Sequence, residues 1–326
     1  MTEPKEKKEE KIANIEFKVR DAKNEIVKVM EEQYPEVKHS DGKKLRGSLA
    51  VIMSDCFGGD HKKAVNYGAA IEFIHSGSLV HDDVLDSHET RRGKPTAVIT
   101  EGIKKALLTG DIMFTNAIKM GAEAGSEEAR TVAKAMEGTL KGAIKEMSLS
   151  NILDDMLLGK LEDDLYYKII DLKTATLFGC SAQFGMLSYT DKKTWISDAY
   201  SYGLYVGRAY QIADDLVDIV NMAEGKKKII PVTVVPMIPA ILKYQKDFLK
   251  TLPFKAMVGR IGLSTIMDSI TELDLTDKMI SEIKSELKQA ESFVDDYGEA
   301  IKDDCVLKQY PKFAINKMLE EIGESI

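Results

Sequence analysis

Cysteine is scarce in this chain, and its pattern does not indicate a structural role. The 326 residues contain three cysteines, Cys56, Cys180 and Cys305, which are odd in number and widely separated. Disulfide-rich proteins and zinc sites carry cysteines in even numbers or at short spacings. The sequence therefore predicts neither a disulfide framework nor a zinc site, and it favours a reducing, intracellular compartment, the cytoplasm.

Long apolar runs and an excess of positive charge are also absent. No apolar stretch approaches the roughly 18 to 20 residues needed to cross a bilayer, and the mixed charges of residues 1–12 match neither a signal peptide nor an anchor. The formal net charge of −8 argues against a nucleic-acid partner, because such proteins carry a basic face. We expect a soluble protein without a transmembrane segment, in which local cations or metal ions bind any polyanionic ligand.

Proline is sparse, and only Pro95 falls between Lys43 and Val220. Long windows there place apolar residues at helical spacing, and none alternates as a strand would. The sequence predicts an all-α fold, a bundle of roughly ten or more helices around a central cavity. Since no linker divides the chain, we expect one domain over residues 1–326, with residues 1–12 frayed. Glycine, proline, serine or aspartate interrupts the helical period at 39–44, 56–61, 91–96, 122–128, 188–193, 222–228 and 272–278.

Two aspartate clusters repeat one spacing, with two adjacent aspartates and a third four residues after the first. They are Asp82, Asp83 and Asp86, and then Asp214, Asp215 and Asp218. Carboxylates one helical turn apart repel each other by roughly a few tenths of a kcal/mol, so two such clusters favour a bound cation. Mg²⁺ suits them, because it prefers oxygen ligands and is usually held by one or two carboxylates plus substrate phosphates. One isolated cluster would more often be a solvated helix edge, but the second lies among apolar residues, which predicts a buried helix whose carboxylates face a cavity.

Basic residues accompany the acidic clusters. Arg91 and Arg92 follow the first cluster, and the glycine and proline after them predict that both lie on the last turn of its helix. They can bind diphosphate oxygens bidentately, or they can simply complement the helix dipole. Lys43, Lys44 and Arg46 precede or open another helix, where backbone N–H groups favour anions. Together these groups favour a diphosphate bridged by metal ions.

Several motifs occur in the order found in the trans-polyprenyl (isoprenyl) diphosphate synthase family, which the sequence resembles over roughly residues 40 to 235. The motifs are SLVHDDVLDSHETRRGKPT (78–96), YQIADDLVD (210–218), GKKLR (42–46), IEFIHSGS (71–78), DLKTATLF (171–178) and LLTGDIMFTNA (107–117). The first two are similar to the two aspartate-rich motifs of that family. The resemblance implies an isoprenoid synthase fold, a homodimer, and an enzyme of the geranylgeranyl or longer-chain type.

The resemblance also implies a role for each matching residue. Asp82, Asp86 and Asp214 would ligate Mg²⁺, three ions when substrate is bound, with Asp83, Asp215 and Asp218 beside or behind them. The allylic diphosphate would be held by Arg91, Lys173 and Lys226. Isopentenyl diphosphate would be held by Lys43, Arg46, His75 and Arg92. The groups acting in catalysis would be Lys173, Thr174 and Gln211, the last two stabilising the allylic cation through their oxygen dipoles.

The implied reaction is a Mg²⁺-dependent condensation of an allylic prenyl diphosphate with isopentenyl diphosphate. Contacts with metal and cations make diphosphate a good leaving group, and the isopentenyl double bond attacks the resulting allylic cation. Proton loss, which the released diphosphate can accept, then completes an all-trans prenyl diphosphate. The sequence contains no Ser-His-Asp or Cys-His pattern that would favour another chemistry.

The segment after the second cluster departs from the family pattern. Seven residues separate Asp218 from Lys226, where the family usually has a longer loop with a further lysine and aspartate. Lys226 or its lysine neighbours would then cover part of the missing work. The alternative is a non-catalytic or regulatory subunit of a heteromeric synthase. A terpene cyclase is less favoured, since it needs no isopentenyl diphosphate site.

Product length in the family depends on the bulk of the residues one turn before the first aspartate cluster. Gly77 and Ser78 lie there in this chain. Their small side chains would leave a tunnel open, which predicts a product of C20 or longer. A residue deeper in the cavity would then end the tunnel, and the candidates are Ile71, Ile74, Met113 and Phe114. The alternative is that Gly77 and Ser78 only allow close packing of helices.

Overall fold

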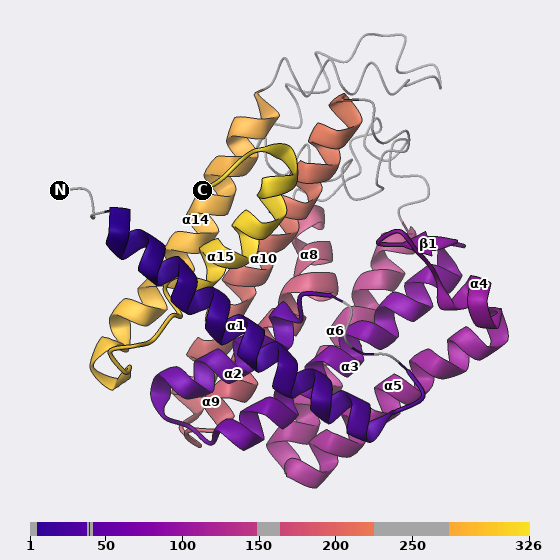
Figure 1. Ribbon diagram of the computed structural model, residues 1–326, viewed down its shortest axis with the longest axis horizontal. Coiled ribbons are helices and arrows are strands. Elements are labelled where there is room, and N and C mark those ends of the chain that lie inside the picture. The colour runs from indigo at the N-terminus through magenta and orange to yellow at the C-terminus, as the bar shows by residue number, and fades with distance from the viewer. Residues whose placement is uncertain (1–4, 38, 40–41, 149–163, 225–273) are drawn as a thin grey trace.

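The computed structural model describes residues 5–37, 39, 42–148, 164–224 and 274–326, and these residues are mostly helical (Figure 1). The α-helices are α1 (Lys5–Gln33), α2 (Leu45–Phe57), α3 (His61–Leu85), α4 (Ala97–Glu101), α5 (Ile103–Ala124), α6 (Ser126–Met147), α8 (Leu165–Ile170), α9 (Thr176–Leu187), α10 (Lys193–Ala223), α14 (Leu275–Asp296) and α15 (Tyr310–Leu319). A π-helical segment, η2 (Asp171–Ala175), joins α8 to α9, and short 3-10 turns, η4 (Gly298–Ala300) and η5 (Glu320–Ile322), flank α15. The all-α prediction is confirmed.

Helix ends fall close to the interruptions predicted from the sequence, and local chemistry explains them. α2 ends at Gly58, whose φ of 77° is left-handed and costs glycine nothing. α3 starts after Asp60, whose side chain accepts a hydrogen bond from the backbone nitrogen of Lys63. Among the described helices, none combines the length and the apolar character that crossing a membrane requires.

The predicted helical position of the two arginines is wrong. α3 ends at Leu85, and Arg91 lies instead in a two-residue strand, β1 (Thr90–Arg91), paired antiparallel with β2 (Lys94–Pro95). Arg92 and Gly93, with φ values of 52° and 72°, form the turn between the strands. Two successive residues with positive φ suit a tight hairpin turn, so this glycine serves the hairpin and not the end of the helix.

The helices surround a site formed from both halves of the chain. α2 packs against α3 and α9, α3 packs against α5, and α10 packs against α9 and α14. In Figure 1, α10, α14 and α15 lie side by side, and α3, α5 and α6 form the opposite part of the bundle. Apolar side chains from both parts form extended buried clusters. This packing places the start of α2, the second half of α3 and the second half of α10 near one another.

The prediction that no cysteines are paired is wrong for two of the three. Cys56, at the end of α2, forms a disulfide with Cys305, which lies 249 residues later in the segment before α15. Next to it, the backbone nitrogen of Lys302 donates a hydrogen bond to the carbonyl oxygen of Cys56 at 2.9 Å. Cys180 is a free, buried thiol. The wide spacing in sequence concealed the pair, and the pairing removes the cysteine argument for a reducing compartment.

Candidate active site

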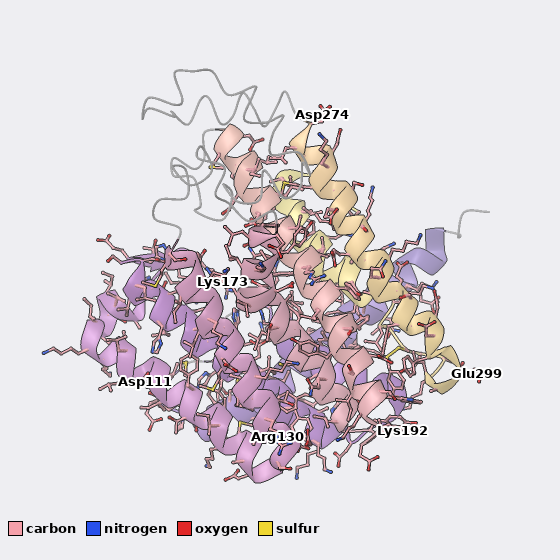
Figure 2. The ribbon with its side chains drawn as sticks, turned by 180° about the vertical axis from the view of Figure 1, so that it is seen from behind. Asp111, Arg130, Lys173, Lys192, Asp274 and Glu299 are labelled. Carbon is pink, nitrogen blue, oxygen red and sulfur yellow. A yellow bond between two sulfur atoms is a disulfide. The ribbon has the colours of Figure 1, made fainter. Side chains whose placement is uncertain are left out.

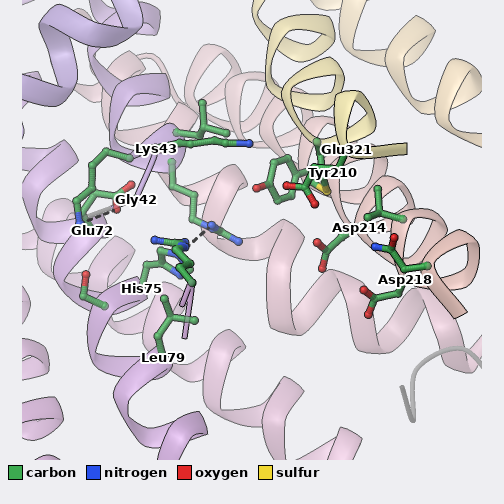
Figure 3. A pocket seen from close by; sticks show the side chains of 17 residues that line it. Gly42, Lys43, Glu72, His75, Leu79, Tyr210, Asp214, Asp218 and Glu321 are labelled. Atoms are coloured by element: carbon green, nitrogen blue, oxygen red, sulfur yellow. Dashed lines mark hydrogen bonds and ion pairs between the residues drawn. The ribbon is translucent and has the colours of Figure 1, made fainter. Parts of the chain in front are cut away.

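A pocket of about 510 Å³ lies between the start of α2, α3, α10 and the C-terminal helix. The described residues that line it are Gly42, Lys43, Lys44, Leu45, Arg46, Glu72, His75, Ser76, Leu79, Arg92, Tyr210, Asp214, Val217, Asp218, Asn221, Met318 and Glu321. Figure 3 shows Lys43, Glu72 and His75 on one side of it and Asp214 and Asp218 on the other. The structure thus brings together all four residues predicted for isopentenyl diphosphate and two aspartates of the second cluster.

Arg46 and His75 form the centre of the basic side. Nη1 of Arg46 lies 3.2 Å from Nε2 of His75, and its guanidinium lies 4.9 Å from the ring centre of Phe178 and 5.7 Å from that of Tyr210. Burial, with the charge of Arg46 close by, lowers the pKa of His75 well below 6.5. The neutral imidazole therefore accepts the hydrogen bond. Among the described residues, the buried Nε of Arg46 has no hydrogen-bond partner, so this cation retains donor capacity for an anion.

The two lysines before α2 point to different partners. Lys43 is exposed, and its ammonium donates to the carbonyl oxygen of Lys317 at 2.8 Å. Lys44 has a left-handed φ of 52° and is buried, with its ammonium 3.7 Å from the carboxylate of Glu72. Glu72 also accepts a hydrogen bond of 2.8 Å from the backbone nitrogen of Gly47. Glu72, which lies in the motif at 71–78 but was given no role there, therefore fixes the start of α2 and neutralises Lys44.

The first aspartate cluster divides by direction. Asp83 is buried, and one of its oxygens lies 2.9 Å from Nε and 2.8 Å from Nη2 of Arg91. Asp82 faces other partners, and burial raises its pKa despite the nearby charge of Lys173. Arg91 and Asp83, predicted to bind diphosphate and metal, thus bind each other here. Asp82 and Asp86 remain the candidates for a ligand.

Lys173 lies beside this cluster, as the motif order predicts. Its ammonium donates a short hydrogen bond to Glu146 of α6. Burial alone would lower the pKa of Lys173, but the carboxylates of Glu146, Asp82 and Asp86 raise it, so the side chain is a cation. Viewed from behind in Figure 2, Lys173 lies near the middle of the molecule, whereas Asp111 lies at the edge. Glu146 belongs to no motif and was missed.

The second aspartate cluster also divides. Asp214 and Asp218 line the pocket, whereas Asp215 is buried and accepts hydrogen bonds from the hydroxyl of Tyr166 at 2.7 Å and from Nε2 of Gln211 at 3.2 Å. Burial raises the pKa of Asp215 to about 7. Ile212, Ala213, Leu216 and Val217 are buried around the cluster, so the prediction of a buried helix is confirmed.

Thr174 and Gln211, which are far apart in sequence, are joined by a hydrogen bond between their side chains. Oγ1 of Thr174 donates to Oε1 of Gln211 at 2.6 Å. Thr174 belongs to the π-helical segment η2, whose first residue, Asp171, accepts two hydrogen bonds from Arg208 at 2.5 and 2.7 Å. Arg208 and Gln211 both lie on α10, so this helix holds both ends of the irregular turn. Single-turn π-bulges often occur at functional sites, and the sequence pattern did not reveal this one.

The small residues predicted to set product length lie where α3 crosses α5. A Cβ atom added to Gly77 would lie 3.0 Å from the carbonyl oxygen of Gly110 and 3.0 Å from Cε1 of Phe114. Ser78 donates its hydroxyl to the carbonyl oxygen of His75 at 2.9 Å. Gly77 therefore serves close helix packing, which was the alternative interpretation, and Ser78 makes a hydrogen bond within its own helix.

The candidate metal ligands are carboxylate oxygens, which suit Mg²⁺ better than a softer metal. In the parts of the chain that the structure describes, no three histidine, cysteine, aspartate or glutamate side chains are close enough to hold a metal alone. Magnesium sites often rely on one or two carboxylates with substrate phosphates and water, so the donor set fits the ion. Lys226, with the spacing that precedes it, lies outside the described residues.

Comparison with known proteins places this geometry in a family. The polyprenyl synthetase family model matches residues 27–231. The geranylgeranyl diphosphate synthase of Saccharolobus solfataricus is 31% identical over 239 residues, 67% of this chain and 70% of that protein. The structure of a decaprenyl diphosphate synthase from Rhodobacter capsulatus superposes with a TM-score of 0.74 at 21% identity, covering 92% of this chain and 97% of that one. A polyprenyl synthase from Caulobacter crescentus, complexed with calcium and isoprenyl diphosphate, gives a TM-score of 0.68 at 22% identity over 93% and 94% of the two chains.

Proposed function

We propose a specific reaction for this protein, which belongs to the polyprenyl synthetase family, a family of prenyltransferases. It condenses an allylic prenyl diphosphate with isopentenyl diphosphate in a Mg²⁺-dependent step, and it releases diphosphate and an all-trans product of C20 or longer. One observation carries the proposal: a single pocket joins a basic side, with Lys43, Arg46 and Arg92, to the aspartates of the second cluster. Elongation needs both, because two diphosphates must be bound next to each other and only one of them must leave.

The basic side of the pocket binds isopentenyl diphosphate. Lys43 and Arg46 at the start of α2 and Arg92 in the hairpin turn line one pocket, so they can neutralise a diphosphate that is retained in the product. His75, held neutral, orients the guanidinium of Arg46 by accepting its hydrogen bond. Lys43 exchanges its backbone partner, the carbonyl oxygen of Lys317, for the ligand. Guanidinium forks suit this role because they bind phosphate oxygens bidentately.

The acidic side binds the leaving group together with the metal. Asp82, Asp86, Asp214 and Asp218 would hold Mg²⁺, three ions in the complex with substrate. When bound, the metal would neutralise the charge that develops on the departing diphosphate. A calcium ion with isoprenyl diphosphate in the related structure from Caulobacter crescentus supports a divalent ion in this family. Asp83 and Asp215 stay behind these ligands, where each is held by a neighbouring side chain.

Lys173, Thr174 and Gln211 act at the reacting carbons. Lys173 lies among the carboxylates of the first cluster, where its charge favours an anionic leaving group. The oxygens of Thr174 and Gln211 lie next to each other and stabilise the allylic cation through their dipoles. Fixed dipoles in a water-poor site stabilise a developing charge without the cost of reorganisation.

A second copy of the chain is the partner that we propose. Large apolar side chains are exposed on α5 and α6, which pack against each other. They are Ile103, Leu107, Leu108, Ile112, Ile118, Leu140, Ile144 and Met147. Such a surface favours a protein partner, and in a symmetric homodimer the same surface of each subunit would be buried against the other. A cytoplasmic location remains part of the proposal, because both substrates are charged, water-soluble diphosphates.

The purified protein tests the reaction directly. It is incubated with isopentenyl diphosphate, Mg²⁺ and labelled allylic primers from C5 to C20, and products are separated by chain length. We expect elongation to C20 or longer, which excess chelator abolishes and added Mg²⁺ restores. No turnover with any primer would contradict the proposal and favour the alternative, a non-catalytic subunit.

Arg92→Ala tests which diphosphate the basic side binds. Losing a charged hydrogen bond costs roughly 1.5 to 3 kcal/mol, so the KM for isopentenyl diphosphate should rise by roughly 10- to 100-fold, with the KM for the primer unchanged. The matched control is Arg130→Ala, since Arg130 forms an exposed ion pair with Glu127 on α6 and should leave both KM values alone. A rise in the primer KM only would assign this side of the pocket to the other substrate.

A further inference from the structure

A chain of hydrogen bonds connects the reacting side of the site to a buried tyrosine outside the motifs. Thr174 donates to Oε1 of Gln211 at 2.6 Å, and Nε2 of Gln211 lies 3.2 Å from Oδ1 of Asp215. The other oxygen of Asp215, Oδ2, accepts from the hydroxyl of Tyr166 at 2.7 Å. Tyr166 is fully buried and packs in the apolar cluster that α8 shares with α10 and α14.

The order of donors and acceptors in this series of hydrogen bonds sets the orientation of the Thr174 hydroxyl. Because Asp215 accepts from the Gln211 amide nitrogen, the amide oxygen must face Thr174. That oxygen can only accept, so the hydroxyl hydrogen of Thr174 is directed to it. The lone pairs of Oγ1 then point away from Gln211, which is the orientation that stabilises a nearby positive charge. A reversed Gln211 amide would instead donate to Thr174 and occupy one of those lone pairs.

We propose that Tyr166 is a positioning residue for the prenyl transfer: its hydroxyl fixes Asp215, Asp215 fixes the Gln211 amide, and the amide directs the lone pairs of Thr174 to the allylic cation. This inference rests on the proposed function, in which Thr174 and Gln211 stabilise that cation. Without the hydroxyl, Asp215 loses the hydrogen bond to Oδ2 and is held less tightly. Nε2 of Gln211 keeps a longer contact of 3.4 Å to Oδ2 of Asp214, so the orientation of the amide is weakened at its shorter contact, the one to Asp215.

The neighbouring tyrosine provides a matched control. Tyr167 also donates to a carboxylate, that of Glu282 on α14, at 2.6 Å. Its ring lies 5.5 Å from that of Tyr166 on the same short helix. The two tyrosines therefore share chemistry and location, and they differ in whether the bonded carboxylate contacts Gln211. Tyr166→Phe and Tyr167→Phe remove the same single oxygen.

Steady-state kinetics of the two variants at saturating Mg²⁺ test the proposal. For Tyr166→Phe we expect kcat to fall roughly 10- to 100-fold, with both KM values within about twofold of the wild type. This decrease does not exceed the decrease in kcat that follows the removal of a group stabilising the transition-state charge directly. Tyr167→Phe should keep the wild-type kcat. A Tyr166→Phe kcat within about twofold of the wild type, or an equal loss in Tyr167→Phe, would overturn the proposal. A wild-type protein without turnover would instead defeat the proposed function, and this is seen before any variant is compared.

Two further measurements separate positioning from a structural or metal-binding role. In a Gln211→Ala background, Tyr166→Phe should cost almost nothing more in kcat, because the route through Gln211 is already lost. The same loss in both backgrounds would refute the route. Recovery of Tyr166→Phe activity at raised Mg²⁺ would assign the loss to metal binding and overturn positioning.

Circular dichroism and thermal unfolding show whether Tyr166→Phe is folded. If it is not, Asp215→Asn tests the same link, because it replaces one acceptor oxygen with a donor and reverses a hydrogen bond. We expect a similar loss of kcat at saturating Mg²⁺ with both KM values retained, and a wild-type kcat would overturn the proposal.

Discussion

Reduction of the Cys56–Cys305 disulfide should lower the stability of the protein more than its activity. The bond closes a loop of 249 residues. In the loop-entropy treatment, cross-linking a loop of that size removes about 18 to 19 cal/mol/K from the unfolded chain, or about 5.5 kcal/mol at 25 °C. That value is the ceiling for the loss of free energy of unfolding, and it is similar to the whole stability of many domains.

The native state retains other contacts at the same place. The hydroxyl of Tyr202 donates to the carbonyl oxygen of Leu307 at 2.7 Å, and the hydroxyl of Tyr310 donates to that of Leu45. After reduction these bonds keep the segment before α15 on α10 and the start of α15 on α2. The reduced protein should therefore stay folded in water at 25 °C, with α15 still supplying Met318 to the pocket.

Urea unfolding with and without dithiothreitol measures the effect. The midpoint should fall on reduction of the wild type, whereas the double variant Cys56→Ser/Cys305→Ser should have a low midpoint that reductant does not change. Thiol titration of the urea-unfolded chain should find one thiol, Cys180, before reduction and three after it. Three thiols before reduction, or equal midpoints in the two wild-type samples, would refute the reasoning.

Two further substitutions test local features of the structure. His61 contacts Asp55 at 2.8 Å and Glu25 at 3.0 Å; burial alone would lower its pKa, but these hydrogen bonds outweigh burial and raise it. Its stabilising charge is therefore fully present below pH 6.5 and lost as the pH rises through the raised value, so the free energy of unfolding should fall over that window in the wild type but not in His61→Gln. A Cβ atom on Gly142 would lie 2.5 Å from the backbone nitrogen of Lys173, so Gly142→Ala should displace the π-helical segment, lower kcat by roughly tenfold or more and destabilise the protein by about 1 to 3 kcal/mol. Identical pH profiles, or wild-type kinetics, would contradict these expectations.

Much of the fold could be predicted because helix periodicity and breaking residues are local signals. The predicted interruptions at 56–61, 122–128 and 188–193 fall at the junctions of α2 with α3, of α5 with α6 and of α9 with α10. The predicted position of Arg91 and Arg92 was wrong because a glycine after a helix can either end the helix or form a hairpin turn. Here the pairing of β1 with β2 makes it a hairpin turn. The disulfide failed because it depends on which distant segments meet.

The site could be predicted in part, and helical geometry explains the division. In each cluster the first and third aspartates lie four residues apart and share a face, whereas the second is turned by about 100° around the helix. Asp83 and Asp215 are those second aspartates, and each is buried against a donor. The helical period alone distinguishes these two from the other four, whereas the family resemblance had grouped Asp218 with them. Tyr166 and Glu146 lie in no motif that the sequence analysis used, and only the fold brings them to the site.

Product length is the prediction that the structure changes most. Gly77→Phe would change helix packing as well as any product tunnel, because even its Cβ atom would lie 3.0 Å from atoms of Gly110 and Phe114. Such overpacking typically costs about 1 to 3 kcal/mol of stability. Ser78 is partly exposed and its hydroxyl donates to the carbonyl oxygen of His75 on its own helix, so a larger side chain has more room there than at Gly77. We expect Ser78→Phe to shorten the product, and Gly77→Ala to lower the melting temperature without changing product length. Chain-length analysis that finds shorter products for Gly77→Ala and unchanged products for Ser78→Phe would show that the tunnel lies along Gly77 after all.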